Sequence, residues 1–532
     1  MEKRIAGLFC FMLIICAILI GKIAVIDTHE DYVSAARNHS TYKLTLAKTR
    51  GKIYDRNKNA LAGDASCLKA LIIPSSKVSA ELLGRIPIEK YNSLEDQLKG
   101  SYPFVTDVSD GSCECDGVTV YRVPKRYPDH SLAVHLVGIC GKNGGESGIE
   151  RAYDNWLASA EGELSVTCRV SASGRSLDGA DREITDTTRN SCRGVMLTID
   201  SNIQNIAETA AAKYMERGAV VVTDIETGEI LAMASLPSYN QNDIATVLND
   251  KRSPLINRAI STYNAGSVFK PVIAAAALEN GLDPNEEYEC SGFVRISDNI
   301  MGCIKHTQHG TVNLEKAISH SCNTYFINLS RRIGGDAIIE MAQKLGFGSE
   351  TKLGQHYSSA AGILPDTSIL TRPAELANLS FGQGRLMVTP IQIAGMTSAI
   401  ARGGEYIEPY VVMGLTDEHM NIISQPYSPE RHMAISRTTA RTLCSCMRTA
   451  VLDGTAKAGA SDKISSAAKT GTAETGIIKN GKKINQAWYA GFFPYENPKY
   501  ACVVLVENGT SGGVAAGPIF KEIAERISAP HR

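Results

Sequence analysis

The chain has 532 residues, 43% of them hydrophobic and 21% charged, so it is long and apolar enough for roughly two to four folded domains, and its composition excludes a disordered protein. Its 55 Lys and Arg residues are balanced by 56 Asp and Glu residues, so a net charge of −1 gives no basic field for a nucleic-acid partner. No H-E-x-x-H or paired C-x-x-C motif occurs, and the C-x-C pairs at Cys113 and Cys444 have the wrong spacing for a zinc knuckle. We therefore predict no metal site and no cofactor.

A strongly apolar segment opens the chain. Lys3 and Arg4 precede an apolar run over residues 5–26 that only Lys22 interrupts, and a lysine near the end of a span can snorkel to the interface. The basic residues mark the cytoplasmic end, and the pattern of small residues at a cleavage site is poor. We predict an uncleaved membrane anchor over residues 1–26, with the rest of the chain on the extracytoplasmic side. A cleaved signal peptide is the alternative.

Fourteen cysteines is a high number for an exported chain, and twelve of them follow the anchor. Cys290 and Cys303 bracket a short Gly-containing segment that a disulfide can close. Others, such as Cys502 in Ala-Cys-Val-Val-Leu-Val, are typical of small buried apolar residues. Sequence alone leaves the pairing open.

The chain after the anchor divides into two parts. Residues 27–190 show short alternating segments punctuated by Gly and Pro and no catalytic cluster, which indicates an elongated N-terminal pedestal, similar to a dimerisation domain. From residue 191 the pattern is more regular: a helix begins near Ser201, and a β-hairpin follows with its turn at residues 226–228. We predict that residues 191–532 form one domain.

The end of the chain repeats this arrangement of strands and helix. Two β-rich segments flank a turn at residues 494–498, and a last helix is predicted over residues 519–527. Helical spacing dominates between the hairpins, including residues 314–345. We predict an α+β fold, in which an antiparallel sheet is covered by the first and last helices and accompanied by a helical subdomain.

The segment Asn264–Gly281 carries the strongest candidate for chemistry. Gly266 permits a sharp turn, Ser267 suits a helix start, and an alanine-rich run continues to Gly281, which can end the helix. Residues three apart lie on one helix face with Cβ atoms about 5–6 Å apart, so the amine of Lys270 can reach the Ser267 hydroxyl. This pairing is typical of a nucleophile beside its base.

The S-x-x-K spacing alone is weak evidence, because it also occurs at four other places: Ser40/Lys43, Ser66/Lys69, Ser349/Lys352 and Ser466/Lys469. Two further motifs strengthen it. Ser-x-Asn occurs at Ser321/Asn323, and Lys469-Thr-Gly-Thr472 occurs once, just before the final hairpin. The three motifs in this order are the set found in penicillin-binding proteins and class A β-lactamases.

The chain resembles the class B penicillin-binding proteins, which are membrane-anchored peptidoglycan D,D-transpeptidases with a serine-transpeptidase fold. The resemblance covers nearly the whole length. Besides the anchor and the three motifs it includes Arg50-Gly51, Asp55-Arg56, Gly148-Ile-Glu150, Tyr153-Asp154, Asn257-Arg258, Phe381-Gly-Gln-Gly384, Thr389-Pro390, Trp488 and Gly491.

The resemblance implies a serine acyl-enzyme. Ser267 attacks the carbonyl of the penultimate D-Ala of a stem peptide, and Lys270 takes its proton, which requires a neutral amine; burial and the charge of Lys469 both lower its pKa. The backbone N–H groups of Ser267 and Thr472 form the oxyanion hole.

The resemblance also assigns the remaining residues of the site. Ser321 relays a proton to the departing D-Ala, and Asn323 holds the substrate amide and Lys270. The terminal carboxylate of the substrate is bound by the segment Thr470, Gly471 and Thr472. An amine of a neighbouring stem then resolves the acyl-enzyme and makes a cross-link.

Two other functions remain open. A D,D-carboxypeptidase or β-lactamase-type hydrolase carries the same motifs, and a β-lactam sensor or a scaffold without catalysis is a second alternative. The expected partners are stem peptides ending in D-Ala-D-Ala, β-lactam antibiotics and a polytopic glycosyltransferase of the SEDS type in the membrane.

Overall fold

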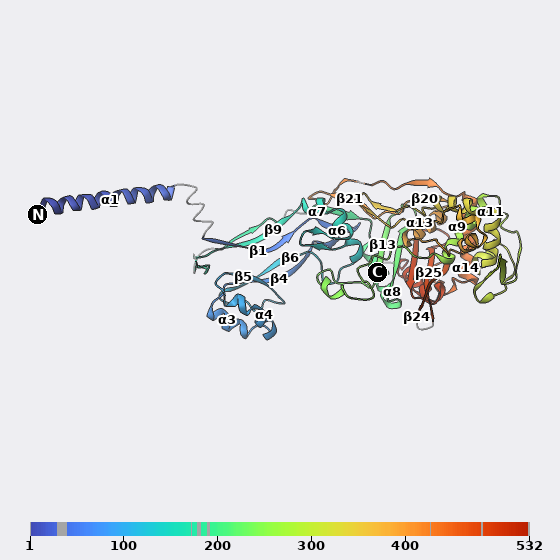
Figure 1. Ribbon diagram of the computed structural model, residues 1–532, viewed down its shortest axis with the longest axis horizontal. Helices are drawn as coiled ribbons and strands as arrows, with labels where there is room; N and C mark the ends of the chain where they lie inside the picture. Colours follow the sequence, from blue (N-terminus) through green and yellow to red (C-terminus); the bar gives the residue numbers. More distant parts are fainter. Residues whose placement is uncertain are drawn as a thin grey trace. The chain divides into compact units, whose positions relative to one another are not determined.

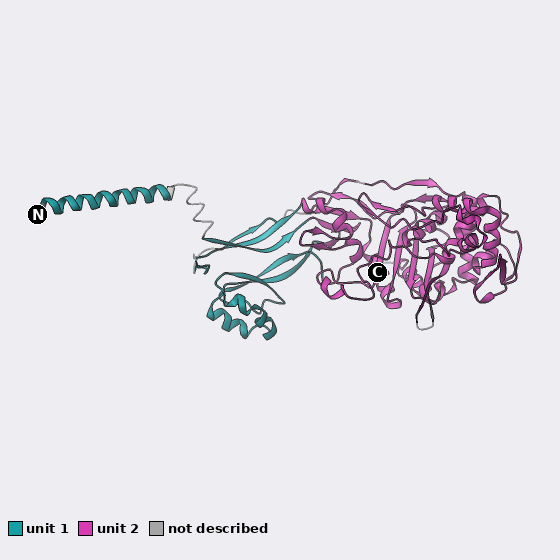
Figure 2. Ribbon diagram, in the orientation of Figure 1, with its two compact units in different colours: residues 1–50, 63–128, 160–191 teal, residues 51–62, 129–159, 192–532 magenta. Residues whose placement is uncertain are grey.

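The computed structural model describes residues 2–28, 40–171, 173–177, 182–188, 192–425, 427–479 and 482–529. The chain forms two compact units that interleave in sequence (Figure 2). The first comprises residues 1–50, 63–128 and 160–191, and the second comprises residues 51–62, 129–159 and 192–532. The units therefore differ from a single division at residue 190, because two segments of the predicted pedestal belong to the second unit.

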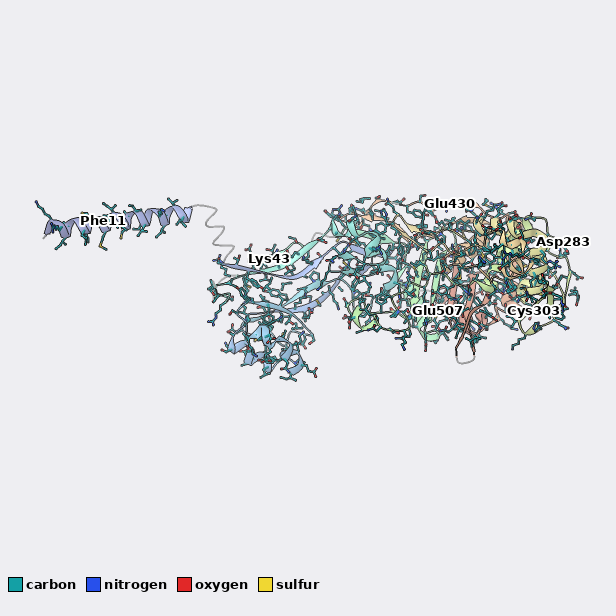
Figure 3. All side chains as sticks on the ribbon, in the orientation of Figure 1. Phe11, Lys43, Asp283, Cys303, Glu430 and Glu507 are labelled. Atoms are coloured by element: carbon teal, nitrogen blue, oxygen red, sulfur yellow. The ribbon has the colours of Figure 1, made fainter. Side chains whose placement is uncertain are left out.

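The first helix, α1 (Glu2–Thr28), is the apolar segment of the N-terminus (Figure 1). Within Lys3–Ile26, the most apolar 18 residues have a mean hydropathy of 2.8, and none of them is buried in protein. Side chains such as Phe11 project from the helix into open space (Figure 3). A predominantly apolar segment of 24 residues is long enough to cross a membrane, so α1 fits a single-pass membrane anchor.

Besides α1, the first unit contains two three-stranded sheets and a pair of helices, which pack around two apolar cores. The sheets have the strand orders β1-β9-β10 and β5-β4-β6. Their elements are β1 (Thr41–Thr49), β4 (Ala65–Ile72), α3 (Ser76–Leu83), α4 (Ile88–Leu98), β5 (Phe104–Val108), β6 (Val118–Lys125), β9 (Gly162–Arg169) and β10 (Glu183–Asp186). One core lies between β4, α3 and α4 and includes Ile72, Leu82 and Leu94; the other joins β1 and β9 through Leu46 and Val166.

The second unit is organised around a five-stranded antiparallel sheet of order β13-β12-β26-β25-β24. Its strands are β12 (Gly218–Asp224), β13 (Ile230–Leu236), β24 (Ala467–Lys479), β25 (Lys482–Phe493) and β26 (Tyr500–Glu507). Both predicted hairpins are present, and the last strand of the chain pairs with the first strand of this sheet. The pairing of β12 with β26 closes the unit across nearly three hundred residues.

Strand alternation explains how this sheet is covered. Val220 and Val222 of β12 point into a core shared with α8 (Ser201–Tyr214) and α15 (Gly517–Ile527), the predicted first and last helices. Thr223 points the other way and bonds to Ser398 at 2.9 Å on α13 (Pro390–Ala401), a helix buried along almost its whole length. The predicted α+β fold is confirmed.

Residues 51–62 belong to the second unit because polar and backbone bonds hold them there. β2 (Lys52–Tyr54) pairs in parallel with β11 (Gly194–Leu197). The Asp55 carboxylate accepts a 2.6 Å hydrogen bond from Ser201, the first residue of α8. These contacts join segments that are more than 140 residues apart, and no local pattern in the sequence predicts them.

The helical subdomain departs from the prediction at one important point. Residues 314–345 do not form a continuous helix: α10 (Leu314–Ser319) ends, and α11 (Asn323–Lys344) begins after a break. Ser321 lies in the break with φ +57°, a left-handed conformation that rarely occurs for a residue with a side chain. Ser-x-Asn therefore lies at a helix N-terminus rather than within a helix.

The remaining helices and strands are short or flank these parts. They are β3 (Ala60–Ala62), α5 (Val134–Val137), β7 (Cys140–Gly141), β8 (Gly144–Gly145), α6 (Gly148–Ala152), α7 (Asp154–Ala158), η2 (Ile244–Val247), η3 (Gly266–Phe269), α9 (Lys270–Glu279), β14 (Tyr288–Cys290), β15 (Phe293–Ile296), β16 (Asn299–Gly302), η4 (Ile304–His306), β17 (Gly310–Val312), β18 (Lys352–Gly354), β19 (Tyr357–Ser358), η5 (Ile369–Thr371), α12 (Pro373–Leu379), β20 (Glu405–Ile407), β21 (Val412–Thr416), β22 (Ile422–Ser424), β23 (Arg431–Met433), α14 (Arg437–Asp453), η6 (Lys457–Gly459) and η7 (Gly512–Ala516).

Candidate active site

Ser267 lies on a tight turn at the start of a buried helix. Gly266 has φ +56°, as its permissive role requires, and the 3₁₀ turn η3 leads directly into α9. A Cβ added to Gly382 would lie 1.9 Å from the Gly266 carbonyl oxygen, and the Gly266 N–H donates to the Gly382 carbonyl at 2.8 Å. The loop carrying Gly382 thus fixes the backbone beside the predicted nucleophile.

Lys270 begins α9 and is completely buried. Its Nζ donates to the Ser321 carbonyl at 2.8 Å, to the Ser321 hydroxyl at 3.1 Å and to Asn323 Oδ1 at 2.7 Å. The amine also lies 5.3 Å from the centre of the Phe326 ring. Lys270 is therefore held by the Ser-x-Asn segment as well as by its own helix.

The Lys-Thr-Gly-Thr segment lies on β24, the edge strand of the main sheet. Lys469 is 1% exposed, and its Nζ donates to the Ser321 hydroxyl at 3.0 Å. The Ser321 hydroxyl consequently lies between the two lysine amines. All three motifs of the sequence come together around this one oxygen.

The backbone of β24 approaches the Ser267 turn closely. A Cβ on Gly471 would lie 3.1 Å from the Val268 nitrogen, and one on Gly266 would lie 2.8 Å from the Thr472 carbonyl oxygen. Only small residues allow these two segments to be so near. The backbone segments that contain Ser267 and Thr472, which we predict to form the oxyanion hole, therefore lie next to each other.

The electrostatics of the site favour neutral amines. Burial lowers the pKa of Lys270 to about 7, although the neighbouring thiols of Cys322 and Cys303 act to raise it. Burial, and then the charge of Lys270, lower the pKa of Lys469 well below its usual value. Because both amines lie within hydrogen-bonding distance of one hydroxyl, electrostatic repulsion disfavours the state in which both are protonated. A neutral Lys270 has a free lone pair and can act as a proton acceptor.

Several supporting residues were not predicted as part of the site. The Thr470 hydroxyl donates a 2.7 Å hydrogen bond to Thr455 Oγ1, the Gly302 carbonyl accepts from Asn323 at 2.8 Å, and the Gly512 N–H donates to the Thr472 hydroxyl at 3.3 Å. Each supporting residue lies outside the motif that it contacts. No motif marks them, and only the Gly-Gly pair at 512–513 gave a sign of close packing.

Comparison with known proteins identifies the family. Residues 218–525 match the penicillin binding protein transpeptidase domain. The chain is 32% identical over 430 residues to the peptidoglycan D,D-transpeptidase PbpA of Mycolicibacterium smegmatis, covering 75% of this chain and 83% of that protein.

Two solved structures have the same fold over most of the chain. Penicillin-binding protein A from M. tuberculosis, solved as its ceftriaxone acyl-enzyme complex, is 26% identical with a TM-score of 0.66 and covers 90% of this chain and 98% of its own. PBP2 from Helicobacter pylori, solved in complex with MreC, is 25% identical with a TM-score of 0.68 and covers 92% of this chain and 98% of its own. With the domain match spanning more than half of its length, this chain belongs to the penicillin-binding protein transpeptidase family and is a class B penicillin-binding protein.

Proposed function

We propose that the protein is a peptidoglycan D,D-transpeptidase that cross-links stem peptides through a serine acyl-enzyme. The observation that carries the proposal is the position of the Ser321 hydroxyl between the buried amines of Lys270 and Lys469. A relay of this kind connects a base beside the nucleophile to the leaving group. The relatives named as D,D-transpeptidases support the substrate.

The acylation step follows from this geometry. Ser267 Oγ attacks the carbonyl carbon of the penultimate D-Ala while neutral Lys270 takes the hydroxyl proton. The backbone N–H groups of Ser267 and Thr472 stabilise the oxyanion. The C–N bond then breaks, and the proton passes through Ser321 to the amine of the departing D-Ala.

Binding and transfer use the remaining residues. Thr470 and Thr472 hold the terminal carboxylate, Gly471 between them lets β24 lie close to the Ser267 turn, and Asn323 holds the substrate amide. Lys469 orients Ser321 through the hydrogen bond that its amine donates to the Ser321 hydroxyl. An acceptor amine attacks the ester carbonyl, the C–O bond breaks, and Ser267 regains its proton.

Full-length protein in detergent, given a donor peptide ending in D-Ala-D-Ala and an amine acceptor, should release one D-Ala for each cross-linked product, as measured by mass spectrometry. A product that is only hydrolysed at saturating acceptor would indicate a D,D-carboxypeptidase. No turnover at all, with β-lactam acylation intact, would indicate a sensor.

We further propose that the protein lies with its catalytic unit outside the cytoplasm and works beside a glycosyltransferase of the SEDS type. The basic residues Lys3 and Arg4 in the first turn of α1 support this orientation. The binding of MreC by the Helicobacter relative supports a docking role. The lobe formed by α3, α4 and β5 is a candidate interface, because it has its own core and exposes Leu83 and Ile88 at 50% and 57%. A passive spacer needs neither feature.

The lobe can be replaced at one place, because Ile72 and Val118 are cross-strand partners on β4 and β6; the replacement also removes β5 from the other edge of β4. Replacing residues 74–116 by Asn-Gly should therefore give a simple hairpin. We expect co-purification with a co-expressed SEDS glycosyltransferase to fall at least about tenfold, the loss of roughly 1.4 kcal/mol of binding free energy. Penicillin labelling should be unchanged, which controls for folding of the second unit. Full co-purification would show that the lobe is no interface.

A further inference from the structure

We propose that Cys290, Cys303, His309 and Cys322 bind a structural zinc ion that holds the Ser-x-Asn segment in place. The four ligand atoms come from three separate segments, and all lie within 4.8 Å of one another. The three cysteines are buried, at 5% exposure or less. A compact Cys₃His set of this kind is a common structural zinc site.

The distances agree with tetrahedral coordination. The Sγ atoms of Cys290 and Cys303 are 3.8 Å apart, as are those of Cys303 and Cys322, and Cys290 Sγ lies 3.4 Å from His309 Nδ1. With Zn–S bonds near 2.3 Å and Zn–N bonds near 2.0–2.1 Å, a tetrahedron has S···S edges of about 3.8 Å and S···N edges of about 3.5 Å. The side chains are therefore arranged as ligands around one point.

A disulfide does not explain the cluster. The possible bridge between Cys290 and Cys303 is absent: both are free, and their sulfur atoms are far beyond the bond length of about 2.0 Å. Three thiols also leave one sulfur over in any pairing. A single ion that accepts three thiolates and one imidazole uses all four groups, with release of the thiol protons on binding.

The local fold aims these side chains inward. Cys290 is the last residue of β14, and it pairs with Gly310, the first residue of β17. His309 directly precedes Gly310. The loop between them turns sharply at Gly292, which has φ +88°, and the Cys303 N–H donates to the Gly292 carbonyl at 2.9 Å. Cys322 enters from the N-terminus of α11. The segments thus converge without a continuous motif.

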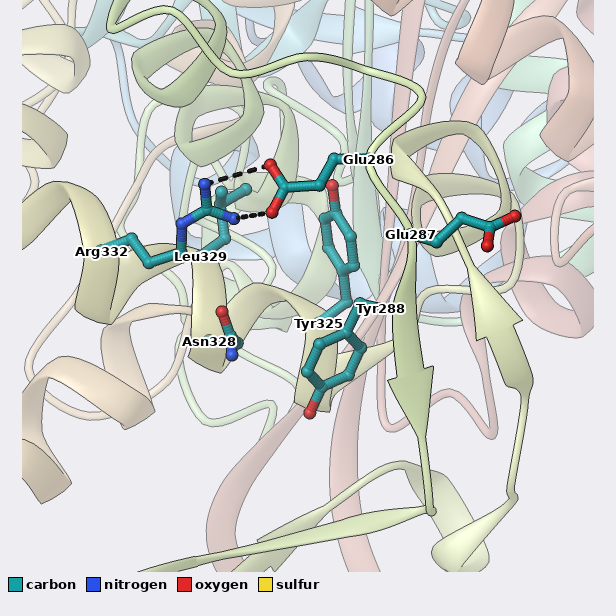
Figure 4. A pocket seen from close by; sticks show the side chains of 7 residues that line it. All are labelled: Glu286, Glu287, Tyr288, Tyr325, Asn328, Leu329 and Arg332. Carbon is teal, nitrogen blue, oxygen red and sulfur yellow. Dashed lines mark hydrogen bonds and ion pairs between the residues drawn. The ribbon is translucent and has the colours of Figure 1, made fainter.

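The surroundings of β14 and α11 support the same arrangement. Arg332 of α11 forms a two-bond pair with Glu286, which precedes β14, at 2.6 and 3.1 Å (Figure 4). Inside, the Thr324 hydroxyl donates to Cys290 Sγ at 3.1 Å. A hydrogen bond to a ligand sulfur is a usual outer contact of a metal site.

The cluster is continuous with the active site. Cys322 is the middle residue of Ser-x-Asn, between the proton relay Ser321 and Asn323. On the other side, Gly302 directly precedes Cys303, and the Gly302 carbonyl accepts a hydrogen bond from Asn323 at 2.8 Å. An ion bound to Cys303 and Cys322 would fix both neighbours of Asn323, and it would support the left-handed backbone of Ser321.

The chemistry of the ligands selects zinc. Thiolate and imidazole ligands in a closed tetrahedral set favour Zn²⁺, whereas Mg²⁺ and Ca²⁺ prefer oxygen ligands. Full occupation by four protein ligands leaves no position for a reacting water. The ion is therefore structural, and the acyl transfer remains the work of the serine and lysines.

Metal content tests the site directly. Full-length protein purified without added chelator should contain one zinc per chain by inductively coupled plasma mass spectrometry. Cys290→Ser and Cys303→Ser should lower this to less than about a tenth, whereas Cys444→Ser, a matched control in α14 outside the cluster, should keep it. His306→Gln should also keep it, whereas His309→Gln should weaken binding. A wild-type protein without zinc, or full zinc in Cys303→Ser, would overturn the proposal.

Cobalt makes the test independent of variants that fail to fold. Wild-type protein stripped of metal and loaded with Co²⁺ should show the intense visible bands and the thiolate charge-transfer band of a tetrahedral site; their absence would contradict it. The effect on acylation rests on the proposed function: the stripped protein should react with penicillin about 10- to 100-fold more slowly and recover with zinc. Ser267→Ala should retain zinc, so a failure of the catalytic assignment leaves the metal result readable.

Discussion

Ser267→Ala is expected to abolish covalent labelling by penicillin. The strained lactam presents an acyl carbon and a carboxylate in the geometry of acyl-D-Ala-D-Ala, so it should react with the same nucleophile as the stem peptide. Intact-mass spectrometry of the wild-type protein should show one adduct of the mass of the antibiotic. The variant should show none, because an alanine at this place has no atom to form the ester.

The S-x-x-K pairs elsewhere in the chain provide the matched control. Ser349→Ala removes the serine of the Ser349/Lys352 pair, which lies outside the cluster of motifs, and should leave labelling at one adduct per chain. Stoichiometric labelling of Ser267→Ala would show that another residue is the nucleophile, and loss of labelling in Ser349→Ala would indicate a general effect of folding.

Lys270→Arg is expected to slow acylation nearly as much as Lys270→Ala, by about 10²- to 10⁴-fold, the usual contribution of a general base. Arginine keeps the positive charge but does not deprotonate in a protein, whereas burial brings the pKa of Lys270 to about 7 and provides a neutral amine. Stopped-flow or quenched-flow labelling with penicillin measures the rate constant.

A larger guanidinium in a fully buried position can also disturb packing, so Lys270→Met serves as a neutral control of similar length. If base chemistry is what matters, the Met and Arg variants should be about equally slow. Substantial acylation by the Arg variant would assign Lys270 an electrostatic role and require a different base. Melting temperatures of all three proteins show whether their folds are intact.

The sequence motifs indicated which residues lie together at the active site. They were less informative about the helices and turns on which those residues lie. Hairpins and amphipathic helices are local patterns, so the sheet, α8 and α15 could be predicted from short windows. The helical spacing of residues 314–345 was misleading, because the apolar positions continue in phase across a break. The left-handed backbone at Ser321 depends on tertiary contacts, including the hydrogen bond that the Lys270 amine donates to the Ser321 carbonyl.

Long-range assembly was beyond what the sequence could indicate. The segment 51–62 joins the catalytic unit through β11 and Ser201, more than a hundred residues away. The sulfur cluster has the same origin: its ligands are separated by twelve, five and twelve intervening residues, unlike the short C-x-x-C spacing of a zinc knuckle. Only the folded loop shows that these positions are neighbours.

Cys322, a ligand of the proposed zinc ion, occupies the middle position of Ser-x-Asn. In the proposed zinc site Cys322 binds the same ion as Cys290, Cys303 and His309, so a change at any one of the four weakens the binding of the ion by the other three. These positions should be gained and lost together along lineages of this family. Sequence changes in the loop between β14 and β17 would then be coupled to changes in the neighbouring Ser-x-Asn motif.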